Sequence, residues 1–262
     1  MEDYRRASEA YYREQATTFG LDGSSTMPDQ VVRERELQAI FAVLDRVMKP
    51  ASRLLEIGCG NGLLLAQLRA RYPDAGLTGI DYTPAMVELA RSRAVPDTRI
   101  ERADVTGLPF EAARFDVMVS ERVIINVLDR DDQARAFAEA GRVLAPGGHF
   151  VCIEGFAAPW RRLNEARAEL CLAEIPMPAV NRWFEDEDFA AYIAGKFEVV
   201  SAPDLPPPNF LSSHYFVTRV FHDAIRPAQG KLRNTHFAKF FASALPPVGD
   251  YAPVKLFLLR RL

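Results

Sequence analysis

Three glycines within five residues form the part of the sequence with the clearest chemical potential. Gly58, Gly60 and Gly62 lie between a short apolar run at residues 53–57 and the helix-like segment 63–68. Glycine has no Cβ atom, so a loop of this composition lets the backbone approach a ligand closely. Loops between a strand and a helix bind nucleotide-like ligands in α/β proteins. A ligand-binding loop is therefore the first prediction.

The glycine spacing and a neighbouring carboxylate decide between two classes of ligand. The dinucleotide pattern G-x-G-x-x-G requires a glycine three residues after Gly60, where the sequence has Leu63. Glu56, at the end of the strand-like run, would repel a pyrophosphate but attract a ligand with ammonium and sulfonium groups. S-Adenosylmethionine (SAM) carries both cations, so the sequence favours SAM over NAD.

Two further acids follow the next two strand-like runs. Asp81 is expected to accept hydrogen bonds from the ribose hydroxyls, and Asp104 one from the adenine amino group. Their neighbours Tyr82 and Val105 complete the predicted cofactor site. Structural alternatives stay open, because Asp81 could cap the following helix and Asp104 could stabilise a turn.

The segments that position these residues alternate between strand-like and helix-like patterns. Helices separate several of these strands, and a Pro-Gly-Gly sequence at residues 146–148 is expected to stop the last of those helices. Such alternation is typical of right-handed βαβ units and of a mainly parallel sheet covered by helices on both faces. Strands are predicted near residues 53–57, 76–81, 99–103, 115–119, 149–154, 197–201 and 254–260, and further helices over residues 31–48 and 160–173.

Length and composition favour a globular α/β chain. Its 262 residues are 48% hydrophobic and 26% charged, with a net charge of −3, which disfavours disorder and a dedicated nucleic-acid binder. Three cysteines without a Cys/His cluster predict neither a disulfide framework nor a metal site. A charged N-terminal stretch and short apolar runs predict a cytoplasmic protein without a membrane partner. The oligomeric state is left open.

The order of the motifs resembles that of the class I SAM-dependent methyltransferases. The resemblance covers about residues 50–155 and is carried by residues 56–62, Asp81, Asp104, 115–119 and 142–148. It implies a Rossmann-like, doubly wound sheet of seven strands whose last strand is antiparallel. It also implies that the glycine loop wraps the methionine part of SAM, while Asp81 holds the ribose and Asp104 meets the adenine.

The activity implied by the resemblance is methyl transfer from SAM to an oxygen or nitrogen atom of a small organic molecule. The chemistry is an in-line displacement, for which positioning of the acceptor supplies most of the catalysis. Two alternatives remain: a SAM-binding partner protein without catalytic activity, and a nicotinamide oxidoreductase.

The chain divides into four expected parts. Residues 1–50 form an N-terminal helical lid segment, and residues 51–202 form the SAM-binding core with a cap helix. Residues 203–253 form an insertion that contributes to a substrate cap, and residues 254–262 form the final core strand. The N-terminal aromatic residues could close over the cofactor or pack against the flank of the sheet; they are Tyr4, Tyr11, Tyr12 and Phe19.

Residues that act on the methyl acceptor are expected after the fourth and fifth strands and in the cap. Ligands of open α/β sheets lie at the carboxyl ends of the strands. The candidate catalytic residues are Glu121, which also joins the cofactor site, Asn126, Glu154 and His214. The candidate acceptor-binding residues are Arg122, Asn181, Arg182, Trp183 and Tyr215. His149 begins its strand and is expected to be structural.

Overall fold

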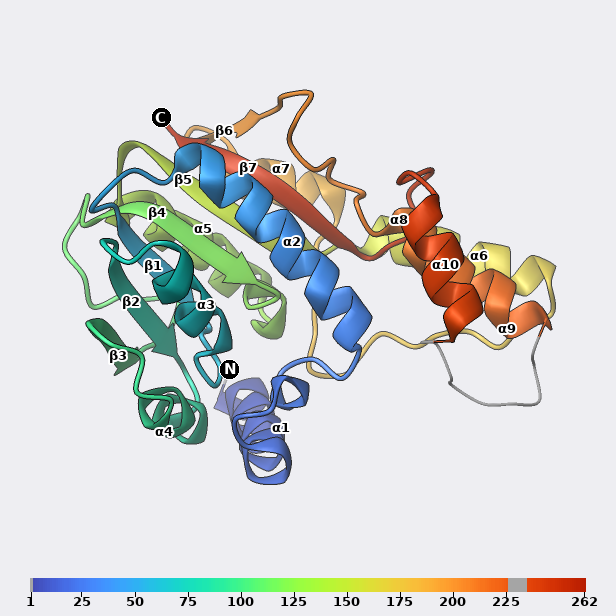
Figure 1. Cartoon of the computed structure of the whole chain (residues 1–262), viewed down its shortest axis with the longest axis horizontal. Helices are drawn as coiled ribbons and strands as arrows, with labels where there is room; N and C mark the ends of the chain where they lie inside the picture. The colour runs from blue at the N-terminus through green and yellow to red at the C-terminus, as the bar shows by residue number, and fades with distance from the viewer. Residues whose placement is uncertain (1, 226–234) are drawn as a thin grey trace.

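A seven-stranded sheet forms the centre of the computed structural model, which describes residues 2–225 and 235–262 (Figure 1). The strand order is β3-β2-β1-β4-β5-β7-β6, and β7 runs antiparallel to both β5 and β6. The predicted Rossmann-like sheet with an antiparallel last strand is thus confirmed. The strands are β1 (Arg53–Ile57), β2 (Gly76–Asp81), β3 (Thr98–Arg102), β4 (Phe115–Glu121), β5 (Leu144–Gly155), β6 (Phe197–Val200) and β7 (Val254–Arg261).

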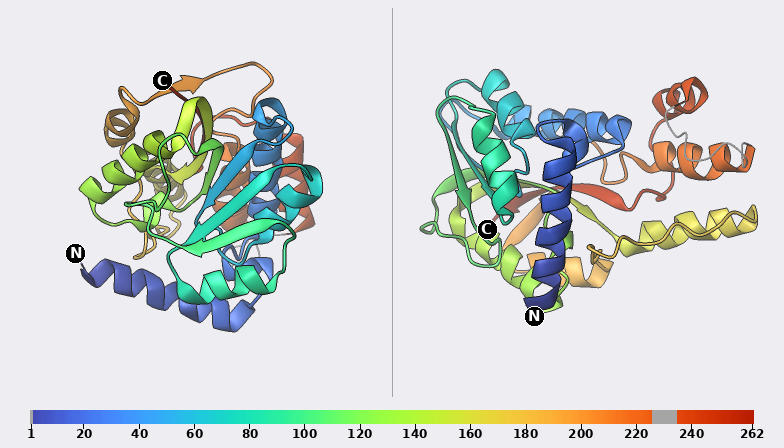
Figure 2. Two further views of the ribbon diagram at one scale, coloured as in Figure 1. Left: turned by 90° about the vertical axis from the view of Figure 1, so that its left-hand side faces the viewer. Right: turned by 90° about the horizontal axis from the view of Figure 1, so that it is seen from below.

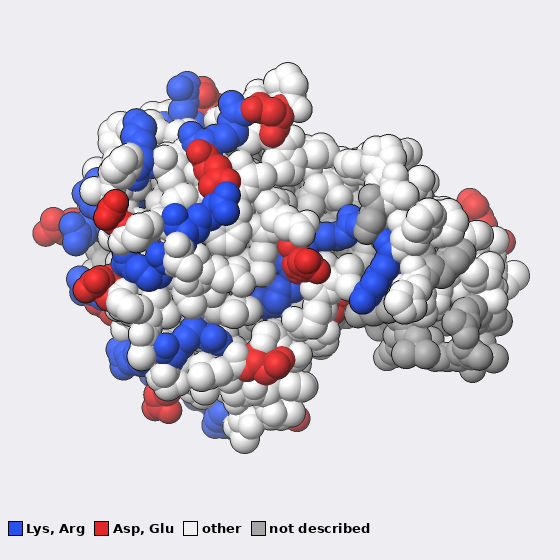
Figure 3. Space-filling model, in the orientation of Figure 1, with Lys and Arg blue, Asp and Glu red and all other residues white. Residues whose placement is uncertain are grey.

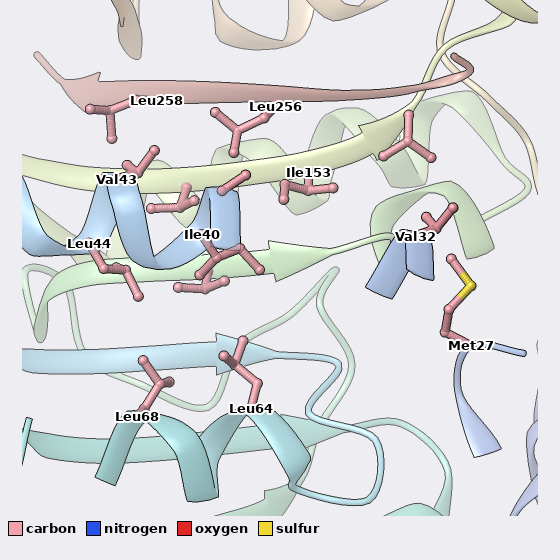
Figure 4. Close-up of a cluster of buried hydrophobic side chains, with 14 of the residues drawn as sticks. Met27, Val32, Ile40, Val43, Leu44, Leu64, Leu68, Ile153, Leu256 and Leu258 are labelled. Atoms are coloured by element: carbon pink, nitrogen blue, oxygen red, sulfur yellow. The ribbon is translucent and has the colours of Figure 1, made fainter. Parts of the chain in front are cut away.

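Alternating side chains on the strands build a separate core on each face of the sheet. Leu54 of β1 faces α2 (Gln30–Val47) and α3 (Leu63–Arg71), whereas its neighbour Leu55 belongs to the opposite core. The first core is drawn in Figure 4, where side chains of α2 and α3 meet those of β5 and β7. The opposite core contains Phe137 of α5 (Arg130–Val143) and Phe189 of α7 (Asp186–Ile193). Burial on both faces makes the strand ends a rigid platform.

The two N-terminal helices have different neighbours. α2 packs on the sheet, and the side chain of Asp29 caps it by accepting a hydrogen bond from the Val32 amide at 3.2 Å. α1 (Glu2–Phe19) lies away from the sheet core and alongside α4 (Pro84–Ser92), which Figure 2 shows from two sides. Residues 1–50 therefore combine one core helix with one peripheral helix.

A group of C-terminal helices projects beyond the sheet (Figures 1 and 2). The insertion predicted at residues 203–253 forms α8 (Ser212–Phe216), a π-helix (Val217–Phe221), α9 (His222–Ile225) and α10 (His236–Ala244). The π-helix and α9 contact α6 (Ala157–Glu169), the expected cap helix, which begins three residues before the predicted start. Residues 226–234 of the insertion lie outside the described residues.

One predicted boundary was wrong. The Pro-Gly-Gly sequence at residues 146–148 does not separate helix from strand, because β5 already begins at Leu144. The pairing of β4 with β5 shifts register between Phe115 and Val117, so the strand accommodates these residues as an irregularity. Residues 145–148 have no partner in β4, and Gly147 has a φ angle of +72°, so the proline and glycines keep a turn-like geometry inside β5.

Candidate active site

A cavity of about 330 Å³ lies at the carboxyl ends of β1, β2 and β4. The glycine loop after β1 forms part of its wall through Gly58 and Gly60. Both have positive φ angles, +62° and +51°. A Cβ atom on Gly58 would lie 2.4 Å from Val123 Cγ2, and one on Gly60 would lie 2.7 Å from Thr26 Cγ2. The loop therefore requires glycine at these positions, and it presents bare backbone to the cavity.

Gly62 has a different role from the other two glycines of the loop. It precedes α3 with a φ angle of +75°, and a Cβ atom there would lie 3.2 Å from the Ala90 Cα in α4. Gly62 is not among the residues that line the cavity. Its lack of a side chain thus allows α3 and α4 to pack closely, so its predicted contact with the cofactor is not supported by its position.

Asp81 ties the glycine loop to the end of β2 and lines the cavity. Its Oδ2 accepts a hydrogen bond from the Gly60 amide at 2.9 Å, and its Oδ1 accepts one from the Thr83 amide at 2.8 Å. Burial raises the pKa of Asp81, and the backbone hydrogen bonds oppose that rise. Each carboxylate oxygen can accept a further hydrogen bond, so Asp81 combines the capping role with capacity for ribose hydroxyls.

Glu56 is a buried carboxyl in the cavity wall, with 4% of its surface exposed. Its Oε2 has no hydrogen-bond partner among the described residues. Burial raises the pKa of Glu56 well above its usual range, and the nearby Glu121 and Asp81 raise it further. A cation beside Glu56 would relieve this penalty. The bare glycine backbone and the unpartnered carboxyl together fit the amino-acid part of SAM.

Asp104 lines the other end of the cavity together with Tyr82 and Val105. Its Oδ1 accepts hydrogen bonds from the Thr106 amide at 2.9 Å and the Thr106 hydroxyl at 2.8 Å. Its Oδ2 lies 3.2 Å from Arg5 Nη2 in α1. Asp104 therefore stabilises the local turn and anchors α1 while it remains at the cavity wall.

α1 closes one side of the cavity. Tyr4 donates a hydrogen bond to Asp132 Oδ2 at 2.7 Å, and Tyr4, Arg5, Tyr11 and Tyr12 all line the cavity. Burial raises the pKa of Tyr12 to about 12, and its hydroxyl contacts Asn126. Of the two N-terminal arrangements left open by the sequence, α1 adopts the one over the cavity. Phe19, at the end of α1, is not among its lining residues.

Residues at and after the end of β4 meet the segment after α6 in the cavity wall. Asn181 donates a hydrogen bond to Asn126 Oδ1 at 2.7 Å, and Asn126 donates one to the Arg122 carbonyl at 3.1 Å. Arg122 has a φ angle of +58°, an uncommon conformation for a residue with a side chain. Glu121, Arg122, Asn126 and Asn181 all line the cavity, so four of the residues predicted for the acceptor come together.

Glu154, a predicted catalytic residue, is fully buried and does not line the cavity. Its carboxylate accepts hydrogen bonds from the Ser120 hydroxyl and from three consecutive amides at 3.0–3.2 Å, those of Val123, Ile124 and Ile125. These four hydrogen bonds come from β4 and from the turn that follows it. Glu154 holds that turn in place, and the structure gives it no access to an acceptor.

His214 and Tyr215 lie in α8, outside the cavity lining. His214 is 2% exposed, and neither ring nitrogen has a hydrogen-bond partner among the described residues. Burial lowers the pKa of His214 to about 4, so the ring is neutral at pH 7. Tyr215 packs against Arg219, whose guanidinium carbon lies 3.7 Å from the ring centroid. The structure therefore does not bring these two residues to the predicted site.

Arg182 and Trp183 also lie outside the cavity lining, although they follow Asn181 directly. Arg182 Nη2 lies 3.6 Å from Asp188 Oδ2 in α7. Trp183 covers Gly155, where a Cβ atom would lie 2.4 Å from the indole Cδ1. The chain turns away from the cavity after Asn181, so these side chains support the cap instead.

Two charged residues of α2 were missed by sequence reasoning. Arg33 lines the cavity, and Glu36 lies directly behind it with no exposed surface. Arg33 Nη1 is 3.9 Å from Glu121 Oε1, and Arg122 Nη2 is 3.4 Å from Glu36 Oε2. The sequence did contain a signal, because both residues interrupt the apolar stripe that continues with Ile40 and Val43 at helical spacing.

Within residues 2–225 and 235–262, no group of three or more His, Cys, Asp or Glu side chains is arranged to hold a metal ion. The same residues contain no helix long and apolar enough to cross a membrane.

The family model described as "Methyltransferase domain" matches residues 54–148, the part of the chain that carries the glycine loop, Asp81 and Asp104. Malonyl-[acyl-carrier protein] O-methyltransferase of Geobacter sulfurreducens is 34% identical over 58% of this chain and 53% of its own length. Demethylmenaquinone methyltransferase of Thermus thermophilus is 34% identical over 40% of this chain and 48% of its own. The chain spans about half or less of the curated relatives that it matches.

Solved structures are similar over nearly the whole chain. A geranyl diphosphate methyltransferase in complex with GPP and sinefungin matches with a TM-score of 0.58 at 16% identity, covering 99% of this chain and 98% of that one. At this identity the similarity establishes the fold alone. The family match identifies a methyltransferase domain over residues 54–148, and the solved structures show its fold. Both findings agree with the SAM-dependent type and the cofactor that the motif order indicates.

Proposed function

We propose that the chain is an enzyme that transfers the methyl group of SAM to an oxygen or nitrogen atom of a small organic molecule. The observation that carries the proposal is one continuous cavity. It joins the predicted cofactor residues at the strand ends to the polar cluster around Asn126 and Asn181, under the cover of α1.

The residues at the strand ends would hold the cofactor by complementary groups. Gly58 and Gly60 would accommodate its amino-acid part, Glu56 its ammonium group, and Asp81 its ribose hydroxyls. Asp104, Tyr82 and Val105 would surround the adenine. When bound, SAM supplies an electrophilic methyl carbon on a cationic sulfur atom.

The remaining part of the cavity would orient the acceptor. Its lining combines apolar side chains with the Asn126–Asn181 pair and the carboxylate of Glu121; the apolar ones include Met27, Pro28, Val123, Ile125 and Val180. Tyr12 and Arg33 close this part from α1 and α2. Such a lining excludes water and holds its few polar groups in fixed positions. It therefore favours an acceptor with an apolar body and one reacting heteroatom. Glu121 is the candidate base for that atom.

The enclosed geometry and the surface charge favour a small acceptor over a polymer. Tyr4, Arg5, Tyr11 and Tyr12 of α1 line one side of the cavity, and Tyr4 is tied to Asp132. On the face shown in Figure 3, Lys and Arg side chains are interspersed with Asp and Glu side chains instead of forming a continuous basic surface. Small molecules are therefore the partners we propose, and a cytoplasmic location stays a prediction.

Calorimetry with SAM, S-adenosylhomocysteine and NAD tests the cofactor assignment. We expect saturable binding of the first two ligands and none of NAD. Transfer of a radiolabelled methyl group from SAM to a panel of hydroxyl, amine, carboxylate and protein acceptors tests the reaction. Transfer to a protein alone would contradict the small-molecule class. Tight SAM binding without transfer to any acceptor class would support the non-catalytic alternative instead.

A further inference from the structure

Glu36 is a fully buried carboxyl group to which the proposed reaction assigns no role. It lies on α2 directly behind the cavity wall, and neither of its oxygens has a hydrogen-bond partner among the described residues. The cationic group beside it is Arg122, at 3.4 Å between Nη2 and Oε2. Burial of an ionised carboxylate with incomplete hydrogen bonding is costly, so its protonation state must be considered.

A second carboxyl group faces Glu36 from the end of β4. Glu121 lines the cavity, and its side chain contacts that of Glu36. Two carboxyl groups can form a hydrogen bond with each other only when one of them carries a proton. Arg122 Nη2 lies 3.5 Å from Glu121 Oε1 as well as 3.4 Å from Glu36 Oε2. One guanidinium therefore bridges both acids, and Arg33 Nη1 adds a longer contact of 3.9 Å to Glu121. Among the described residues, Glu36 thus has only a shared cation at ion-pair distance, which favours placing a proton on Glu36.

The surroundings of Glu36 come from three elements. Four groups interact with it electrostatically: Arg33 on the same helix, Glu121 at the end of β4 with Arg122 directly after it, and Tyr215 on α8. Burial raises the pKa of Glu36 to about 8, because the lowering by Arg122 and Arg33 is opposed by Glu121. The protonated form of Glu36 is therefore favoured in the cofactor-free protein.

We propose that Glu36 and Glu121 share one proton in the cofactor-free protein and release it when the cationic cofactor binds beside Glu56 and Glu121. The inference rests on the proposed function, because SAM supplies the positive charge. Glu56 and Glu121 lie in the same cavity wall and interact electrostatically, and Glu56 has an unpartnered oxygen. A positive charge at this wall stabilises carboxylates over carboxylic acids, so it favours loss of the shared proton.

The same pair would receive the proton that the acceptor loses. In methyl transfer a bond forms between the acceptor atom and the methyl carbon, and the carbon–sulfur bond breaks with its electron pair remaining on sulfur. The positive charge of the sulfonium is thereby lost, so the carboxyl pair regains its affinity for a proton. Glu121 faces the cavity and takes it from the acceptor, and Glu36 shares it. The acceptor group thus carries an O–H or N–H hydrogen, because a carboxylate has no proton to give.

Proton release can be measured directly by calorimetry at pH 7 in two buffers with different ionisation enthalpies. We expect the binding of SAM to release at least about half a proton more than the binding of neutral-sulfur S-adenosylhomocysteine. Glu36→Gln should remove this difference while SAM still binds. Glu34→Gln is the matched control, since Glu34 is exposed on the same helix, and it should retain the difference.

Equal proton release with the two ligands in the wild-type protein, or an undiminished difference in Glu36→Gln, would overturn the proposal. If Glu36→Gln does not fold, Glu121→Gln removes the other half of the pair. The infrared spectrum of the cofactor-free protein provides a second, ligand-independent measurement. The wild-type-minus-variant difference should show a protonated carboxyl band that disappears as the pH rises through about 8. Absence of this band rejects the shared proton, whereas failure of both ligands to bind rejects the proposed function.

Discussion

The two ends of the cavity are built in different ways. At the cofactor end, the cavity wall is formed by backbone at the carboxyl ends of β1 and β2. Asp81 binds the glycine loop to the sheet through the Gly60 amide. At the acceptor end, side chains from α1, α2 and two loops converge, as the Asn181–Asn126 hydrogen bond illustrates. The first end is encoded within residues 56–105 of the sequence, and the second depends on contacts between distant segments. The comparison indicates that the residues for the shared cofactor lie close together in the sequence. The residues that would select the acceptor come from widely separated segments.

Gly58→Ala should have the largest effect on the cofactor end. The new Cβ atom would meet Val123 at 2.4 Å, and alanine is unfavourable at a φ angle of +62°. We expect a loss of about 3 kcal/mol in the free energy of unfolding, from backbone strain and overpacking together. SAM binding should weaken at least about tenfold, which corresponds to roughly 1.4 kcal/mol.

Gly147→Ala is the matched control for that variant. Gly147 has a φ angle of +72°, but no atom lies within 4 Å of the Cβ position. It should therefore show only the strain of the backbone conformation, about 1–2 kcal/mol of stability, with unchanged SAM affinity. Equal effects of the two variants in urea titration and calorimetry would contradict the close approach of the loop to Val123.

His214, in the helical insertion, should make the stability of the protein depend on pH without affecting cofactor binding. The pKa of His214 is lowered to about 4 by burial, whereas the unfolded chain titrates near the usual value of 6.5. Between these values the unfolded state binds more protons, so stability falls as the pH falls from 6.5 towards 4. The full contribution is about 3 kcal/mol.

His214→Gln isolates this contribution, since glutamine does not titrate. Urea unfolding at several pH values should show a shallower acid loss of stability in the variant than in the wild type. The affinity for SAM at pH 7 should be the same in both proteins, because α8 does not line the cavity. An identical pH dependence in the two proteins would refute the neutral, buried state of His214.

Asp81→Asn should affect binding more than folding. Asparagine keeps one acceptor oxygen for the loop but loses the charge and the second acceptor. Loss of charge-assisted hydrogen bonds to the ribose should weaken SAM binding by about 1–3 kcal/mol, measured by calorimetry. His149→Ala, in β5, should leave the affinity nearly unchanged. An unaltered affinity in Asp81→Asn would remove the ribose assignment.

Tyr4→Phe, in the helix α1 that covers the cavity, should have the smallest effect on ligand binding. The variant loses the hydrogen bond from Tyr4 to Asp132 that helps to hold α1 over the cavity. We expect S-adenosylhomocysteine to dissociate a few times faster in stopped-flow experiments, in line with about 0.5–1 kcal/mol for one hydrogen bond. Tyr11→Phe, a change at a neighbouring cavity residue, should dissociate at the wild-type rate. A similar acceleration in both variants would argue against a specific role of Tyr4.

The sequence predicted the features that depend on local patterns. Short apolar runs separated by helical segments marked the strands, and their order implied which strand ends would carry Glu56, Asp81 and Glu121. The interactions that a given polar side chain makes could not be predicted from these patterns. Glu154 follows the same strand-end rule as Glu121, but it points into the turn after β4, where three amides bind it. Its role depends on a turn that only the folded chain creates.

The roles of residues far from the motifs could not be predicted either, because they too depend on contacts that only the folded chain makes. Arg33 and Glu36 occupy the apolar side of α2, where a pattern of hydrophobicity alone predicts core packing. Their partners Glu121 and Arg122 are more than eighty residues away in the sequence. In the C-terminal insertion, packing among helices determines the π-helix and the burial of His214. The sequence of this insertion has no hydrophobic periodicity from which that packing could be predicted.

A crystal structure of the protein with sinefungin, a cationic analogue of SAM, tests the central claim most directly. The ribose hydroxyls should lie within hydrogen-bonding distance of the Asp81 carboxylate, and the amino-acid part should lie against Gly58 and Gly60 with its ammonium group beside Glu56. A ligand bound outside the cavity at the ends of β1, β2 and β4, or bound there without contact to Asp81, would contradict the proposed site.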